Sequence, residues 1–299
     1  MKVLITGGSG FIGNHLARRL IDEGHQINIL DTHPSNIENC NFIAKDIKNL
    51  DDVEDAVNGC DIVCHLAAKV SVIKTEQDPI GTYYINTVGT TNVLAACLKY
   101  NISKIFFTSS SEVYGNPEKI PITENGKLNP VSTYGRSKIA AEKLIELSEL
   151  KYSIVRLFNV YGGGQRTDFV IPKFIHLALN DKPITIYGKG EQVRSFCHVS
   201  DIVDGILLAM FESSSIDQVF NIGNDQEPLT MLELADKIFR LIGKPSKLDF
   251  VGFPDRTANR EIYRRIPDIN KAKKLLKYNP KISLDEGLMD VIKWWRLRV

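Results

Sequence analysis

The sequence predicts an α/β protein built on a doubly wound parallel sheet, with a smaller second lobe. Three observations support this prediction. Short β-branched runs alternate with longer amphipathic segments, two of the runs are apolar almost throughout (DIVCHLA and KIFF), and a glycine-rich turn joins the first run to the first helix. Such alternation is typical of right-handed βαβ units, and continuously apolar strands are typical of parallel strands covered on both faces.

The expected elements follow from these local patterns, in chain order. The strand-like runs are KVLIT, QINIL, NFIA, DIVCHLA, KIFFTSS and YSIVRLF. The amphipathic segments predict helices at about residues 11–23, 50–58, 79–100 and 134–150. After Asn159 the turn signals cluster, in YGGGQR, NDKP, YGKGEQ and GNDQEP. We therefore expect a first domain over residues 1–158 and a smaller lobe over residues 159–299, with segments that cross a soft boundary.

Composition excludes several classes of function. The chain has 299 residues, of which 43% are apolar, and its 37 basic residues nearly balance its 36 acidic ones. Without a basic block or a long apolar run, nothing points to nucleic acid or to a membrane. The opening residues show no secretory signal, and the five cysteines have neither disulfide-like nor metal-ligand spacing. We expect a cytoplasmic protein with reduced thiols and no metal.

The turn after the first strand has the pattern of a dinucleotide site. Gly8, Gly10 and Gly13 form a G-x-G-x-x-G motif, preceded by Gly7, between a strand and a helix. Glycines allow the backbone to approach a pyrophosphate, and the helix N-terminus attracts that anion. Asp31 ends the next strand, where a carboxylate can bind the adenosine ribose, and no arginine follows it in DTHPSN. The pattern predicts a Rossmann-type site for NAD rather than NADP; a purely structural glycine turn is the alternative.

The stretch STYGRSKIAAEK places Tyr134 and Lys138 four residues apart at the start of a predicted helix. Such a pair can be an ordinary surface contact. Downstream of a cofactor turn, it can instead form a proton-transfer device with Ser110, which ends the strand KIFFTSS. A free phenol has a pKa of about 10, and a nearby ammonium favours the phenolate. We therefore expect Lys138 and a nicotinamide ring to lower the pKa of Tyr134.

The motifs TGGSGFIG, HLAA, SSSEVYG, YGRSK and RLFNVYG resemble those of the extended short-chain dehydrogenase/reductase family, in its nucleotide-sugar epimerase, dehydratase and decarboxylase branch. The similarity extends nearly end to end, to PDINKAKKLL and SLDEGL. It implies an enzyme that binds NAD and a UDP-linked nucleotide sugar, and that begins by oxidising a sugar hydroxyl, usually at C4.

The resemblance also implies roles for individual residues. Catalysis is assigned to Ser110, Glu112, Tyr134 and Lys138. NAD binding is assigned to Gly7, Gly10, Phe11, Ile12, Gly13, Asp31, Asp46, Ile47, Leu66, Ala67, Ala68, Tyr134 and Lys138. Substrate binding is assigned to Ser110, Ser111, Tyr134, Asn159, Arg194 and Arg260. His65, beside an apolar strand end, is interpreted as a packing histidine rather than a base.

Two residues bear on the reaction that follows C4 oxidation. Dehydratases of this branch carry Asp-Glu after the catalytic residue, whereas this chain has Ser111 and Glu112, which counts against dehydration. The Ser-Glu pair is similar to that of glucuronate decarboxylases, in which a glutamate and an arginine assist; Arg265 is a candidate for that arginine. The same motif is compatible with several epimerases.

We therefore predict a UDP-sugar 4-epimerase that uses a transient 4-keto sugar, with UDP-glucuronate decarboxylase as the alternative. A 4-keto-sugar reductase and a non-catalytic NAD sensor remain as further alternatives. Gly163 and Thr133 stand where relatives often carry proline, so the loop at Gly163 is expected to be looser. In relatives, two long helices of each subunit form a four-helix bundle, which implies a homodimer.

Overall fold

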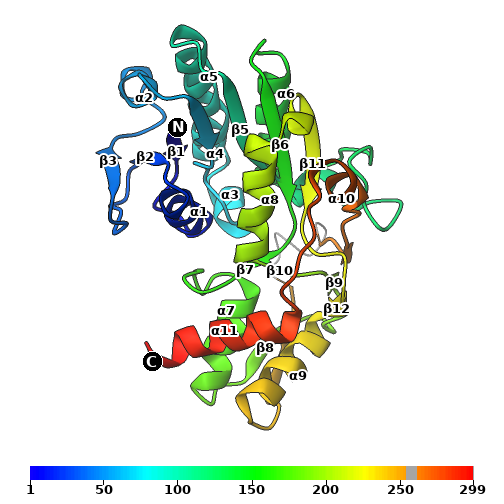
Figure 1. Ribbon diagram of the computed structural model, residues 1–299. Helices are drawn as coiled ribbons and strands as arrows, with labels where there is room; N and C mark the ends of the chain where they lie inside the picture. Colours follow the sequence, from blue (N-terminus) through cyan, green and yellow to red (C-terminus); the bar gives the residue numbers. More distant parts are fainter. Residues whose placement is uncertain (254–260, 299) are drawn as a thin grey trace.

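Within the described residues, 1–253 and 261–298, this computed structural model is centred on a seven-stranded parallel sheet (Figure 1). The strands lie in the order β11-β6-β5-β4-β1-β2-β3. They are β1 (Lys2–Thr6), β2 (Gln26–Asp31), β3 (Cys40–Ala44), β4 (Ile62–His65), β5 (Lys104–Ser110), β6 (Tyr152–Leu157) and β11 (Gln218–Ile222). From β1 the chain extends the sheet through β2 and β3 on one side and through β4, β5, β6 and β11 on the other. This order confirms the predicted doubly wound fold.

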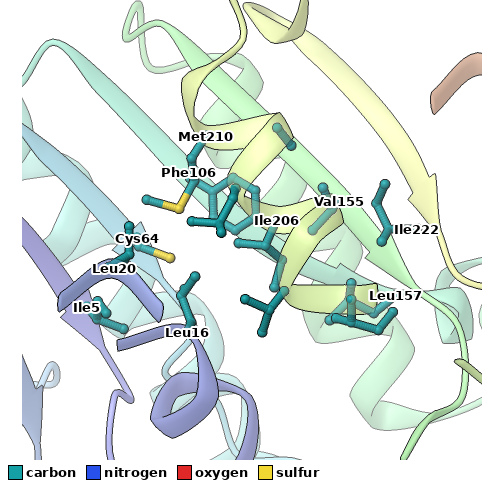
Figure 2. Packing of buried hydrophobic residues seen from close by; sticks show 14 of the residues in the cluster. Ile5, Leu16, Leu20, Cys64, Phe106, Val155, Leu157, Ile206, Met210 and Ile222 are labelled. Carbon is teal, nitrogen blue, oxygen red and sulfur yellow. The ribbon is translucent and has the colours of Figure 1, made fainter. Parts of the chain in front are cut away.

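Helices cover both faces of this sheet. One face carries α1 (Phe11–Asp22) and α8 (Val199–Phe211), and the other carries α2 (Leu50–Val57), α5 (Gly89–Lys99) and α6 (Thr133–Glu146). Figure 2 shows side chains of the first face, all from one apolar cluster: Ile5, Leu16, Leu20, Cys64, Phe106, Val155, Leu157, Ile206, Met210 and Ile222. Burial of both faces explains the nearly continuous apolar runs in β4 and in the first half of β5.

Two predicted helices differ in detail from those observed. The expected helix over residues 79–100 consists of α4 (Pro79–Tyr83), a π-helical turn η1 (Tyr84–Val88) and α5. Helix α6 ends at Glu146 rather than near residue 150, because Glu149 adopts a φ of 59°, which a right-handed helix does not accommodate. A short helix α3 (Val72–Gln77) was not predicted.

The second half of the chain builds a lobe with its own apolar core, in which Phe174, Leu234 and Leu288 are buried. Its elements are β7 (Val160–Tyr161), α7 (Val170–Leu179), β8 (Ile184–Tyr187), β9 (Val193–Arg194), β10 (Cys197–His198), β12 (Leu229–Thr230), α9 (Met231–Ile242), β13 (Leu248–Val251), β14 (Arg264–Arg265) and α11 (Leu284–Arg296). Between them, α8 and β11 return to the central sheet, and α10 (Asn270–Leu276) contacts β11. The division at residue 159 therefore remains a proposal in which segments cross between the parts.

Two further observations concern the described chain as a whole. None of its helices combines the length and the apolar character needed to cross a lipid bilayer. The cysteines are free thiols, four of them buried and Cys40 half-buried.

Candidate active site

A cleft of about 1220 Å³ opens at the carboxyl ends of strands β1, β2, β4 and β5. Most of the residues predicted for function line it: Gly7, Gly10, Phe11, Ile12, Gly13, Asp31, Asp46, Ile47, Leu66, Ala67, Ala68, Ser110, Ser111, Glu112, Tyr134, Lys138 and Asn159. Arg194 is not among the described residues that line it, and Arg260 lies outside the described residues. The fold thus brings the predicted cofactor turn and the predicted catalytic group into one cavity.

The glycine turn is too tight for side chains. Gly7 has a φ of +72°, and a Cβ added there would lie 2.7 Å from the Cα of Ala67. A Cβ at Gly13 would lie 2.6 Å from the carbonyl oxygen of Gly7. Because this space is kept free at the N-terminus of α1, backbone amides can approach an anion there. The turn therefore fits the pyrophosphate of a dinucleotide.

The wall next to this turn fits an adenosine. The carboxylate of Asp31 ends β2 and accepts hydrogen bonds from the backbone amides of Ser9, at 3.1 Å, and His33, at 2.9 Å. These bonds fix the carboxylate at the edge of the cleft, where it can also accept from ribose hydroxyls. The residues after it are Thr32 and His33, which bring no guanidinium to bind a 2′-phosphate.

The predicted base, Tyr134, lies in the first turn of α6. That helix begins where the Ser132 hydroxyl accepts a hydrogen bond from the Gly135 amide, at 3.0 Å. Burial raises the pKa of the Tyr134 phenol, the negative charge of Glu112 raises it further, and a hydrogen bond with Ser110 lowers it. The expectation that this pKa falls is therefore wrong for the chain by itself.

Lys138 explains this difference. Its ammonium donates to the carbonyl of Thr108, at 2.9 Å, and lies 5.9 Å from the centroid of the Tyr134 ring. It also sits 4.6 Å from the Phe107 ring centroid. Burial lowers the pKa of Lys138 to about 7, against the opposing effect of the Glu142 carboxylate. The pKa of Lys138 thus lies near neutrality, and its ammonium is closer to the Phe107 ring than to the Tyr134 ring.

Glu112 connects two walls of the cleft. One carboxylate oxygen pairs with the Arg265 guanidinium at 2.6 Å, and the other accepts from the Ser132 hydroxyl at 3.0 Å. Arg265 belongs to β14 and lines the cleft, and its buried Nε atom has no hydrogen-bond partner among the described residues. Both carboxylate oxygens of Glu112 are therefore engaged, one of them at the start of the helix that carries Tyr134.

The two remaining described substrate candidates are held by their neighbours. The Asn159 side-chain amide donates to the Ser195 carbonyl at 2.8 Å while the residue lines the cleft. Arg194 pairs with Glu261 at 3.0 Å, and burial together with the Arg265 charge lowers its pKa to about 10. The predicted diphosphate contact by Arg194 stays a prediction.

His65 is a packing residue, as expected. Its ring nitrogens lie 2.7 Å from the Thr6 hydroxyl and 3.0 Å from the Thr90 hydroxyl. Burial, with a smaller effect of the Lys138 charge, lowers the pKa of His65 to about 3. The imidazole is therefore neutral at physiological pH, and it lies behind the cleft rather than in it.

Other features of the site were not predicted. Lys74 of α3 pairs with Asp168 at 3.0 Å, which links two walls of the cleft, and no sequence signal joins two residues so far apart. Glu142 was not predicted either, although a sequence signal for it exists. It stands four residues after Lys138, and helical spacing places the two on one face of α6.

Comparison with known proteins shows where this arrangement recurs. The sequence profile of the NAD dependent epimerase/dehydratase family matches residues 3–223. The chain is 35% identical to a putative UDP-glucose 4-epimerase of Methanocaldococcus jannaschii, over 98% of each sequence. It is also 35% identical to UDP-glucuronic acid decarboxylase 4 of Arabidopsis thaliana, over the whole chain and 69% of that protein.

Solved structures of related proteins share the fold as well as the sequence similarity. The structure of UDP-glucose 4-epimerase from Thermotoga maritima with UDP-glucose superposes with a TM-score of 0.93 at 30% identity, over 99% of both chains. These matches confirm the resemblance to the extended short-chain dehydrogenase/reductases, and the family's dependence on NAD confirms the predicted cofactor. The chain belongs to the NAD-dependent epimerase/dehydratase family.

Proposed function

We propose that this enzyme is a UDP-sugar 4-epimerase that works through a transient 4-keto sugar. The observation that carries the proposal is the convergence of Ser110, Tyr134 and Lys138 on a cleft that also holds the glycine turn. Proteins named as UDP-glucose 4-epimerases are among its relatives in both sequence and structure.

The chemistry assigned to the chain is proton transfer at the C4 hydroxyl. The glycine turn and Asp31 would hold NAD, which would supply a reversible hydride acceptor for C4. Tyr134 takes the hydroxyl proton, and the ammonium of Lys138 favours the phenolate that does so. Ser110, already hydrogen-bonded to Tyr134, shares the proton path and donates to the new carbonyl oxygen. Inversion requires only that the 4-keto sugar turn over in the cleft and receive hydrogen on its other face.

The charge balance of the cleft favours a neutral sugar. The guanidinium of Arg265 is compensated by Glu112 at 2.6 Å, and the second oxygen of Glu112 is held by Ser132. A sugar carboxylate would have to compete with Glu112 for Arg265. Ser111, in the position where dehydratases carry an acid, offers a hydroxyl of pKa far above neutrality and cannot expel water efficiently.

A decarboxylase acting on UDP-glucuronate is the second candidate. It is favoured by the buried Arg265 Nε, which lacks a hydrogen-bond partner in the part of the chain that the structure describes and can donate to a sugar carboxylate. The pairing of Glu112 with Arg265 also brings together the two residue types that the resemblance assigns to decarboxylation, and decarboxylases are among the relatives.

A panel of three sugar nucleotides distinguishes the two reactions. We expect UDP-glucose or UDP-N-acetylglucosamine, incubated with the enzyme and catalytic NAD, to give a C4-inverted product of unchanged mass in proton NMR and mass spectrometry. UDP-glucuronate is expected to remain without loss of carbon dioxide. Release of carbon dioxide would select the decarboxylase, and stoichiometric NADH consumption with a 4-keto sugar would select a reductase. Tight NAD binding without any turnover would indicate a sensor.

We also propose that the enzyme is a homodimer through α4, η1 and α5, which with α6 are the helices of the expected bundle. Large apolar side chains are exposed along them: Ile80 (83%), Tyr83 (39%), Tyr84 (51%), Val88 (38%) and Leu98 (49%). Such a patch favours an interface. Light scattering should give the mass of two chains for the wild type and of one chain for Ile80→Glu/Tyr84→Glu; a monomeric wild type would contradict this arrangement.

A further inference from the structure

Behind the cleft, a buried guanidinium is clamped by a buried carboxylate. Arg156 of β6 is 4% exposed and Glu142 of α6 is fully buried. Arg156 donates from Nε to one oxygen of Glu142 at 3.1 Å and from Nη2 to the other at 2.8 Å. This two-point geometry holds both side chains in one orientation, and it fixes α6 against the strand beneath it.

The same guanidinium also reaches the segment that follows Ser110. Its Nη1 donates to the hydroxyl of Tyr114, at 2.8 Å, and to the carbonyl of Glu124, at 3.0 Å. Tyr114 ends the turn η2 (Ser111–Tyr114) that directly follows Ser110. Arg156 therefore contacts both elements that supply the proposed proton path, the helix of Tyr134 and the turn after Ser110.

A contribution to fold stability does not by itself explain why the chain buries this ion pair. Removing two charges from water is costly, and apolar side chains of similar size often stabilise a core as well. Neither Arg156 nor Glu142 is among the described residues that line the cleft, so direct contact with substrate does not explain the pair either. What distinguishes Glu142 is its place on α6, one helical turn beyond Lys138 and on the same face.

We propose that Arg156 and Glu142 are positioning residues of the proposed reaction: Glu142 favours the charged form of Lys138, and Arg156 holds α6 in register with the turn after Ser110. The inference rests on the proposed function, because the charge of Lys138 matters to the reaction only if Tyr134 accepts a proton from the sugar.

The surroundings of Lys138 support this role for Glu142. Strand β5 presents the Phe107 ring and a carbonyl to the ammonium, and β4 presents His65, which is neutral at physiological pH. On its own helix, Lys138 faces the Tyr134 ring and Glu142. Burial disfavours the ammonium, and Glu142 supplies the negative charge that opposes this effect.

The test is the pH profile of turnover, measured with the sugar nucleotide that the wild type converts. In Glu142→Gln the alkaline limb of the kcat profile should move to lower pH by about one unit, since loss of a nearby opposite charge shifts a pKa by roughly that much or more. The KM is expected to change less than twofold. Glu142→Asp keeps the charge farther from Lys138, so its limb should move in the same direction by less.

Glu124→Gln is the matched control. It neutralises a carboxylate that accepts from the Asn221 amide, and it retains the backbone carbonyl that Arg156 contacts, so its limb should coincide with that of the wild type. An unmoved limb in Glu142→Gln overturns the inference, as does an unmoved limb in Glu142→Asp if the glutamine variant does not fold. An equal shift in Glu124→Gln also overturns it. If the wild type converts none of the sugar nucleotides, the proposed function fails instead.

Discussion

Tyr134→Phe is expected to lower turnover by about a thousandfold, within the range that general acid–base groups contribute, while leaving NAD binding intact. The substitution removes one oxygen atom, the one assigned to accept the C4 hydroxyl proton. The ring itself is retained, so its packing beside Lys138 and against the cleft is preserved. Tyr134 supplies a phenol to the described lining of the cleft, hydrogen-bonded to Ser110 and one helical turn from Lys138.

The measurement is the initial rate of C4 inversion together with the NAD retained after gel filtration. Tyr152→Phe serves as the control, because it makes the same chemical change in β6, outside the cleft, and should leave the rate within twofold. A Tyr134→Phe enzyme that keeps more than a tenth of wild-type turnover would exclude the phenol as the base.

The substitution Gly13→Ala is expected to lower the affinity for NAD at least a hundredfold. The new Cβ would lie 2.6 Å from the Gly7 carbonyl oxygen and 2.7 Å from the Gly8 Cα, so the backbone of the turn has to move. Displacement of the turn withdraws the amides and the helix N-terminus from the pyrophosphate. Because both clashing atoms belong to the backbone, no side-chain rotation relieves the contact.

Calorimetric titration with NAD gives this affinity, and circular dichroism checks that the variant is folded. Gly252→Ala is the matched control, since a Cβ there meets nothing within 4 Å and should leave NAD binding unchanged. Wild-type affinity in a folded Gly13→Ala protein would show that this turn does not hold the dinucleotide.

The parts of this structure that local patterns encode could be predicted. Strands β1, β2, β4, β5 and β6 coincide with strand-like runs of the sequence, and the apolar side chains of each are buried in one of the two clusters that cover the sheet. The glycine turn was predictable in part for a similar reason, because the backbone atoms that crowd Gly13 belong to Gly7 and Gly8 of the same motif. The close approach of Gly7 to Ala67, by contrast, depends on the neighbouring strand.

Features that depend on distant segments could not be predicted in the same way. The pairing of Glu112 with Arg265 requires β14 to lie beside the end of β5, and no local pattern specifies that. In the chain without NAD the pKa of Tyr134 lies above its ordinary value, whereas spacing shows only that Lys138 is near and not that it donates to Thr108. Burial, which decides the direction, is a property of the whole fold.

The proposed chemistry is tested most directly with UDP-glucose that carries deuterium at C4, by measuring the rate of inversion and the position of the label in the product. If Tyr134 and Lys138 promote oxidation at C4 with internal return of the same hydrogen, the C4-inverted product should retain the deuterium at C4, with a slowed rate. Loss of the label to solvent, or inversion without any isotope effect and with the label displaced from C4, would contradict the proposed chemistry.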